Sequence, residues 1–169
     1  MEILFSEEAV SSRIRVMGQE IREFYRGREP LTLIALLNGA LPFAADLMRR
    51  IDLPLWIDTL AVASYHGHES SGEQTFRSTL KLPVENRHIL IADEVLDTGA
   101  TLRRVTEDIK RRGALSVKTA VLIEKSIPRP PEFLHADWTG FVAPDRYLVG
   151  CGLDFNEMYR QLPFIAALD

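Results

Sequence analysis

The sequence of 169 residues lacks the features of several large classes of protein. It has a single cysteine, Cys151, which excludes an intrachain disulfide and a zinc site built from several cysteines. No apolar run approaches the length that spans a membrane, and the first residues lack the basic and apolar regions of a signal peptide. These absences favour a cytoplasmic protein without a membrane partner.

A strongly basic charge and the common nucleotide-binding motifs are also missing. The net charge is −4 with both signs mixed, so no nucleic-acid partner is indicated. Neither the glycine pattern of dinucleotide-binding folds nor a phosphate-binding loop ending in Gly-Lys-Ser/Thr occurs. The length and an apolar content of 46% suit one domain, residues 1–169, with a substantial core.

Helices and strands alternate through most of the chain. Ser6, followed by two acids, predicts the start of a helix whose apolar stripe runs from Val10 to Phe24. Further strands are predicted at 31–37, 56–64, 88–92 and 117–123, and further helices at 42–51 and from about 102 to 112. Two short strand-like runs are expected in the tail, 136–168. This alternation predicts a doubly wound α/β fold.

The segment Leu90–Leu102 is the most informative part of the sequence. It joins an apolar run to the carboxylates Asp93, Glu94 and Asp97, and then turns through Thr-Gly-Ala-Thr into a helix. The unpaired N–H groups of a helix N-terminus bind anions, and carboxylates bind hydroxyls or a metal ion. A solvated acidic loop is the alternative. We therefore predict a site for a phosphorylated sugar.

Polar residues follow three of the predicted strands. Asn38 and Gly39 follow the strand at 31–37, the acidic segment follows the strand at 88–92, and Lys125 follows the strand at 117–123. Ligands of doubly wound sheets bind beyond the carboxyl ends of the strands. These three features are therefore expected at one edge of the sheet.

Four blocks of the sequence resemble a known family. The run Ile89–Leu102 resembles the phosphoribosyl-diphosphate (PRPP) motif of the type I phosphoribosyltransferases, and Pro144–Ile165 resembles the purine-binding end of the hypoxanthine-guanine phosphoribosyltransferases. Leu37–Ala40 is similar to the pyrophosphate loop, and Ser64-Tyr65 to the start of the flexible catalytic loop. The resemblance implies the type I fold: a mostly parallel twisted sheet flanked by helices, with a small hood formed by terminal segments and a flexible loop.

The resemblance also implies an activity in purine salvage. It is the Mg²⁺-dependent transfer of the 5-phosphoribosyl group from PRPP to N9 of hypoxanthine or guanine, which gives IMP or GMP and pyrophosphate. Asp97 would be the catalytic residue, which moves a proton at purine N7. Lys125 would meet the purine O6, and because an ammonium only donates hydrogen bonds, it should reject the 6-amino group of adenine.

The other roles are also implied by the resemblance. The metal ligands would be Asp93, Glu94 and Asp154. PRPP and its phosphates would be bound by Asn38, Gly39, Ser64, Tyr65, Glu94, Val95, Leu96, Thr98, Gly99, Ala100, Thr101, Leu102 and Arg160. The purine would be bound by Lys125, Arg146, Tyr147, Leu148 and Asp154.

The chain departs from the family pattern at two places. Asn38 stands where many relatives have lysine, and Asp93-Glu94 reverses the usual order of the two acids. A preference for xanthine is one alternative function. A PRPP-sensing regulatory protein on the same fold is another, which the presence of Asp97 and the absence of a basic face disfavour. The family implies a homodimer or homotetramer.

Overall fold

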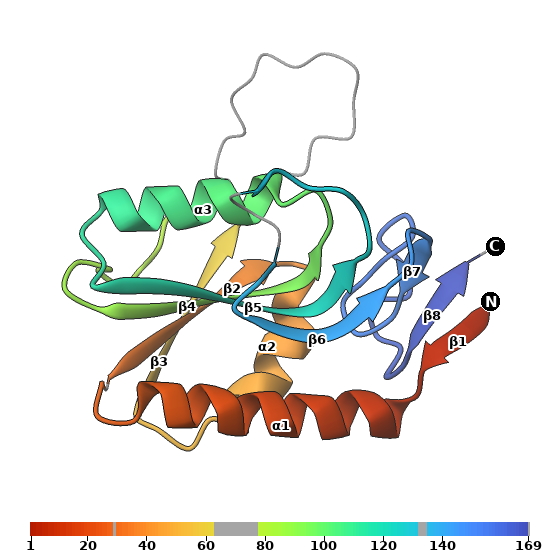
Figure 1. Cartoon of the computed structure of the whole chain (residues 1–169), viewed down its shortest axis with the longest axis horizontal. Coiled ribbons are helices and arrows are strands. Elements are labelled where there is room, and N and C mark those ends of the chain that lie inside the picture. Colours follow the sequence, from red (N-terminus) through yellow and green to blue (C-terminus); the bar gives the residue numbers. More distant parts are fainter. Residues whose placement is uncertain (29, 63–77, 132–134, 169) are drawn as a thin grey trace, which may run out of the picture.

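A five-stranded sheet forms the centre of the fold, with strand order β3-β2-β4-β5-β6 and every pair parallel (Figure 1). The computed structural model describes residues 1–28, 30–62, 78–131 and 135–168. The strands are β2 (Leu31–Leu37), β3 (Leu55–Ala61), β4 (His88–Leu96), β5 (Ser116–Lys125) and β6 (Trp138–Ala143). The predicted α/β fold with a parallel sheet is confirmed.

Three helices cover the two faces of this sheet. Helices α1 (Glu7–Tyr25) and α2 (Ala40–Met48) lie on one face, and α3 (Ala100–Arg111) lies on the other (Figure 1). Helix α2 begins two residues earlier than predicted, so Pro42 lies in its first turn, where the missing N–H has no partner to lose. Within the part of the chain that the structure describes, none of the helices is long and apolar enough to cross a membrane.

The first and last strands form a second, smaller sheet. Strands β1 (Glu2–Phe5), β8 (Ile165–Leu168) and β7 (Tyr147–Val149) pair in the order β1-β8-β7, all antiparallel. The first and the last strand of the chain therefore lie side by side (Figure 1). The expected hood of terminal segments is confirmed, and we call this three-stranded sheet the hood. Strand β1 was not predicted, and the tail contains three strands rather than two.

The N-terminal helix follows the predicted stripe with one exception. The Ser6 side chain accepts a hydrogen bond from the Ala9 N–H at 3.3 Å, as expected of a capping residue. Val10, Ile14, Met17 and Ile21 are buried. The prediction for Phe24 was wrong: its ring is exposed, and Tyr25, four residues after Ile21, is buried instead.

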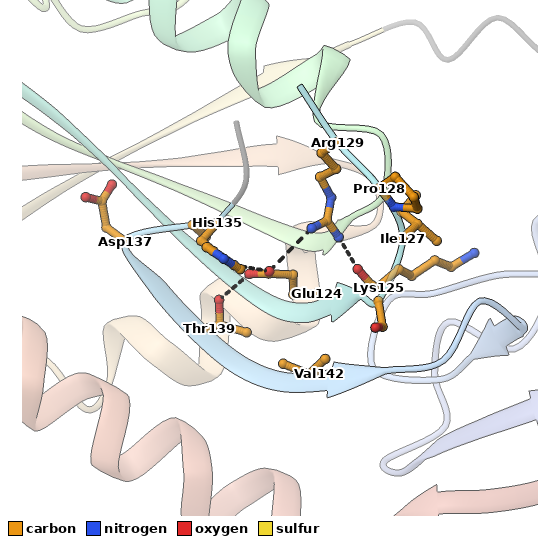
Figure 2. Close-up of a pocket in the computed structure, with 11 residues that line it drawn as sticks. Glu124, Lys125, Ile127, Pro128, Arg129, His135, Asp137, Thr139 and Val142 are labelled. Atoms are coloured by element: carbon orange, nitrogen blue, oxygen red, sulfur yellow. Dashed lines mark hydrogen bonds and ion pairs between the residues drawn. The ribbon is translucent and has the colours of Figure 1, made fainter. Parts of the chain in front are cut away.

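The chain after β5 turns back over the ends of β4 and β5. Ile127, Pro128 and Arg129 lie in this segment, and the Arg129 side chain points at the strand ends (Figure 2). A pocket of about 630 Å³ is lined by the end of β5, this segment and part of β6.

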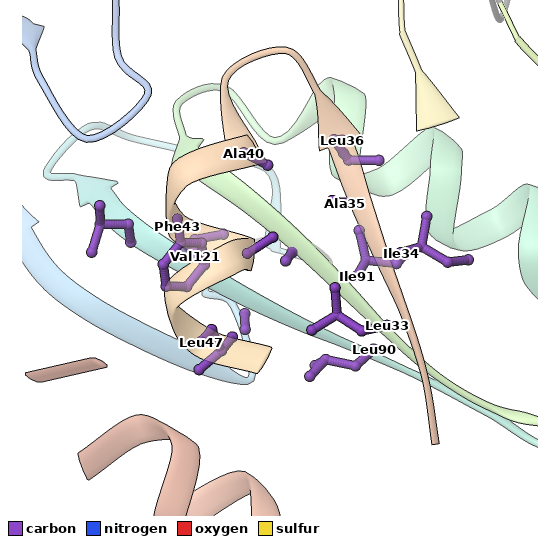
Figure 3. Packing of buried hydrophobic residues seen from close by; sticks show 14 of the residues in the cluster. Leu33, Ile34, Ala35, Leu36, Ala40, Phe43, Leu47, Leu90, Ile91 and Val121 are labelled. Carbon is purple, nitrogen blue, oxygen red and sulfur yellow. The ribbon is translucent and has the colours of Figure 1, made fainter. Parts of the chain in front are cut away.

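The core explains why the central strands are almost entirely apolar. Helices cover both faces of the sheet, so six consecutive residues of β2 are buried. Leu33 of β2 and Leu90 of β4 are neighbours in the sheet and lie on the face that α2 covers, beside Phe43 and Leu47 (Figure 3). Ile34 and Ile91, the next residues along these strands, are also buried and point to the opposite face. This packing holds α2 against β2 and β4, directly below the loop that joins β2 to α2.

Candidate active site

The carboxyl ends of β2, β4 and β5 meet at one edge of the sheet. β4 lies between β2 and β5 and runs parallel to both. The loop with Asn38 and Gly39 follows β2, the turn with Asp97 follows β4, and Lys125 is the last residue of β5. The predicted convergence of these three polar features is confirmed.

The turn after β4 ends in a helix N-terminus with exposed backbone donors. Gly99 precedes α3 with φ 85°, a left-handed conformation that glycine adopts without strain. Gly99 provides no capping side chain, and the Thr98 Oγ1 lies 3.5 Å from the Ala100 nitrogen. The first N–H groups of a helix have no partner within the helix. The segment from Thr98 to Leu102 can therefore bind an anion such as a phosphate.

Two neighbouring carboxylates lie inside β4, not after it. The strand continues to Leu96 because Leu96 still pairs with Glu124 of β5, so the prediction that the strand ends at Ala92 was wrong. Asp93 is only 8% exposed, and its Oδ1 accepts a hydrogen bond from the Glu94 N–H at 3.0 Å. Burial raises the pKa of Asp93 well above its usual range, and the charge of Glu94 raises it further.

Burial also raises the pKa of Glu94. Two adjacent carboxylates that are both disfavoured as anions gain from ligand hydroxyls or a cation. Among the residues with described positions, no three carboxylate, imidazole or thiol groups come together as a metal site. Asp93, Glu94 and Asp154 therefore do not form one cluster of ligands. This arrangement fits Mg²⁺, which is commonly held by one or two carboxylates together with substrate phosphates.

The loop after β2 is packed closely against two other segments. A Cβ atom at Gly39 would overlap the Glu94 carboxylate, and a Cβ atom at Gly152 would overlap the Gly39 carbonyl oxygen. The peptide bond between Leu37 and Asn38 is cis, and the Asn38 carbonyl accepts a hydrogen bond from the Leu41 N–H at 3.1 Å. A side chain at 152 would displace the backbone of the loop, and one at 39 would displace the Glu94 carboxylate, so the two glycines permit this close approach.

Asp97 and Lys125 face each other across the ends of β4 and β5. The Lys125 Nζ lies 3.7 Å from the Asp97 Oδ2 and 3.3 Å from the Asp145 Oδ1. The Lys125 side chain is only 16% exposed, whereas that of Asp97 is 50% exposed. Lys125 is therefore not a solvated lysine at a strand end. Its ammonium and the Asp97 carboxylate form a donor and an acceptor side by side.

The hood carries the residues expected at the purine. Tyr147 is exposed, and its ring meets the Phe155 ring edge-on with centroids 5.4 Å apart, while the Leu148 side chain is buried. Arg146 forms an ion pair with Glu2 of β1. An exposed aromatic ring suits stacking on a flat base.

Arg160 connects the C-terminal segment to the strand ends. Its guanidinium lies 2.9 Å from the Asp154 Oδ1 and donates to the Gly152 carbonyl at 2.7 Å. The positive charge of Arg160 lowers the pKa of Glu94, and the negative charge of Asp154 raises it. Arg160, Asp154 and Glu94 therefore lie close enough to interact electrostatically. The buried Arg160 Nε has no hydrogen-bond partner among the atoms that the structure describes.

The remaining predicted residues are of two kinds. Leu96 and Leu102 are buried and Val95 packs against the core, so only their backbone groups are available to a ligand. Ser64 and Tyr65 lie outside the described residues.

Two further residues, Glu124 and Arg129, lie beside the site and were not predicted from the sequence. Their side chains are 5% and 4% exposed, and they form an ion pair of 3.4 Å next to Lys125 (Figure 2). The only signal in the sequence was a glutamate directly after the apolar run 120–123 of β5.

Comparisons with known proteins agree with this geometry. Residues 2–155 match the phosphoribosyl transferase domain family. The bifunctional protein TilS/HprT of Listeria monocytogenes is 41% identical over 168 residues, which are 99% of this chain and 26% of that protein. The chain thus spans about a quarter of the length of such bifunctional relatives.

Other relatives have nearly the same length as this chain. The hypoxanthine-guanine phosphoribosyltransferase of Staphylococcus epidermidis is 40% identical over 98% of this chain and 92% of that protein. The hypoxanthine-guanine-xanthine phosphoribosyltransferase of Tritrichomonas foetus is 34% identical over 98% and 90%. A crystal structure of a hypoxanthine phosphoribosyltransferase from Staphylococcus aureus superposes with a TM-score of 0.91 and 35% identity, covering 100% of this chain and 93% of that one. The chain therefore belongs to the phosphoribosyltransferase family, in the group of the hypoxanthine-guanine phosphoribosyltransferases.

Proposed function

We propose that this chain is a purine-salvage enzyme that transfers the 5-phosphoribosyl group from PRPP to N9 of hypoxanthine or guanine. The observation that carries this proposal is the pair of Asp97 and Lys125, 3.7 Å apart beside the helix N-terminus at Gly99. A 6-oxopurine presents N7 and O6 on the same side, so an acceptor and a donor at neighbouring positions match its edge. The turn at residues 98–101, which we call the phosphate turn, directly follows Asp97 in the chain. It can therefore bind the sugar phosphate of the second substrate while Asp97 faces the base.

The residues divide the reaction between them. Thr98 to Thr101 bind the 5′-phosphate at the start of α3, and Asp93 and Glu94 face the ribose hydroxyls. As N9 forms its bond to C1 of the ribose and pyrophosphate leaves, Asp97 accepts the proton from N7 while Lys125 donates a hydrogen bond to O6.

The purine and pyrophosphate ends of the site use the hood and the neighbouring loops. Tyr147 stacks on the base, Leu148 presents its backbone to the base edge, and Arg146 supports this strand. Gly39 and Arg160 bind pyrophosphate. Asp93 and Glu94 would hold one Mg²⁺ beside the ribose, and Asp154 would help to hold a second one at the pyrophosphate; when bound, the metal neutralises the charge of PRPP and pyrophosphate.

The test is an assay of the purified protein with PRPP, Mg²⁺ and each of hypoxanthine, guanine, xanthine and adenine. We expect IMP or GMP and an equal amount of pyrophosphate, no product from adenine, and no turnover when EDTA removes Mg²⁺. Failure to convert any oxopurine would overturn the proposed activity, and binding of PRPP without turnover would indicate a regulatory protein instead.

A preference for xanthine is the second candidate. It is favoured by the similarity to the Tritrichomonas foetus enzyme, whose name includes xanthine. The same assay decides between the two, because a xanthine enzyme gives a higher kcat/KM for xanthine than for hypoxanthine.

We also propose that the protein acts in the cytoplasm as a homodimer or homotetramer, without a nucleic-acid or membrane partner. Light scattering coupled to size-exclusion chromatography measures the assembly, and a monomeric mass at assay concentration would contradict this proposal.

Replacement of Lys125 tests the discrimination between purines. A hydrogen bond to a charged group contributes about 1.5 to 3 kcal/mol, so Lys125→Gln should lower kcat/KM for hypoxanthine by about 10- to 100-fold. The glutamine amide can also accept a hydrogen bond, so activity with adenine should rise relative to hypoxanthine. Lys118→Gln is the matched control, because Lys118 lies on the same strand and pairs with Asp137 at 2.7 Å, away from Asp97. Equal effects of the two substitutions would contradict the role of Lys125.

A further inference from the structure

The proposed reaction requires a fixed distance between the side chains of Asp97 and Lys125. These two residues do not pair with each other in the sheet. The last paired residues of β4 and β5 are Leu96 and Glu124. Asp97 and Lys125 come directly after this pair, at the end of the β4–β5 ladder. The ladder therefore cannot by itself fix the separation of their side chains.

The Arg129 guanidinium links the two strands beyond the end of this ladder. Its Nε donates to the Asp97 carbonyl oxygen at 2.5 Å, and its Nη2 donates to the Leu96 carbonyl oxygen at 3.0 Å. The same Nη2 donates to the Lys125 carbonyl oxygen (Figure 2). One planar group thus binds the backbone of both residues that face the purine. An arginine can do this because its five donors form a rigid fork, whereas a lysine ammonium is a single point charge.

The guanidinium is itself held from behind by Glu124. The Glu124 Oε1 lies 3.4 Å from the Arg129 Nη1 and accepts a hydrogen bond from His135 Nδ1 at 2.6 Å, and Oε2 accepts one from Thr139 Oγ1 at 2.8 Å (Figure 2). A buried ion pair often contributes no more to stability than apolar side chains of the same size. This ion pair lies where Arg129 joins the ends of β4 and β5, so it can serve to hold these strand ends in place.

We propose that Arg129 is a positioning residue, which sets the separation of Asp97 and Lys125 so that both engage the purine edge at once. The inference rests on the proposed function of these two residues. Arg129 binds their backbone and needs no contact with the substrate.

The first test compares Arg129→Lys with Arg13→Lys. Arg13 is a matched control, because its guanidinium also donates to two carbonyl oxygens, those of Thr139 and Gly140, at 2.8 and 3.1 Å, and pairs with Glu20. These contacts lie between α1 and β6. A misplacement of about 1 Å can cost about a hundredfold in rate, so we expect Arg129→Lys to lower kcat by about 10- to 100-fold. Arg13→Lys should leave kcat within about twofold of the original protein.

The second test separates positioning from general loss of structure. Because Arg129 binds the turn at the Asp97 carbonyl oxygen, ahead of the residues 98–101 proposed to bind the phosphate, KM for PRPP should change by less than about twofold in Arg129→Lys. In the Asp97→Asn background, Arg129→Lys should lower kcat by less than about threefold, since the residue that it positions is already inactive.

The outcomes distinguish this inference from the proposed function. If the unsubstituted protein converts no oxopurine, the proposed function fails. If the unsubstituted protein is active but Arg129→Lys leaves kcat unchanged, the positioning role fails. It also fails if Arg129→Lys lowers kcat by the same factor in the Asp97→Asn background as in the original protein. Both measurements use Arg129→Lys, which retains the charge facing Glu124, and its thermal unfolding is followed alongside to confirm a folded protein.

Discussion

Asp97→Asn should lower kcat by about two to four orders of magnitude with little effect on KM for PRPP. The amide is nearly the same size as the carboxylate but cannot accept the N7 proton. The Lys125 ammonium would still lie near an oxygen at this position, so recognition of O6 should persist while proton transfer is lost. Steady-state kinetics in which PRPP and then hypoxanthine is the varied substrate measures kcat and both KM values.

Asp145→Asn is the control for this experiment. Asp145 is the other carboxylate beside Lys125, at 3.3 Å, and its side chain is 66% exposed. Its replacement removes the same charge from the environment of Lys125 but leaves Asp97 in place, so kcat should change by less than about threefold. An unchanged rate in Asp97→Asn, or equal losses in the two variants, would remove Asp97 from the proton transfer.

Gly152→Ala should destabilise the protein by about 3 to 5 kcal/mol and abolish most of its activity. Gly152 has φ 103°, and a Cβ atom there would overlap the Gly39 carbonyl oxygen. A left-handed conformation costs an ordinary residue about 1 to 2 kcal/mol, and displacement of backbone in a packed region adds to this. The displaced atom belongs to the loop expected to bind pyrophosphate, so KM for PRPP should rise as well.

Gly27→Ala provides the control for backbone conformation alone. Gly27 also has a positive φ, of 78°, but a Cβ atom there meets no atom within 4 Å. We therefore expect it to lose about 1 kcal/mol and to keep its activity. Urea unfolding followed by circular dichroism gives both free energies. A Gly152→Ala protein as stable as Gly27→Ala would show that the loop tolerates the added atom.

The residues at the strand ends could be predicted because their positions follow from local pattern. Apolar runs mark buried strands, and the residues after parallel strands must meet at one edge, so the amino-acid sequence alone places Asp97 and Lys125 there. The length of β4 could not be predicted in this way. Asp93 and Glu94 are poor strand residues, and they remain in the strand because β5 supplies partners as far as Leu96.

Arg129 was missed for a different physical reason. It lies in an irregular segment between Pro128 and Pro130, where no periodicity exists, and its partners are backbone carbonyl groups that every sequence contains. Strand β1 was missed because four residues carry too weak a pattern. Its partner, β8, lies more than 150 residues away along the chain.

The pairing of Glu2 with Ala167 and of Tyr147 with Leu168 sets the order in which the two halves of the site can form during synthesis. Every strand of the parallel sheet, and with it the turn at Gly99, precedes residue 144 and can pair early. The strand that carries Tyr147 acquires its partner only after residues 165–168 have left the ribosome. A growing chain should therefore form the site proposed for the phosphate before the site proposed for the base.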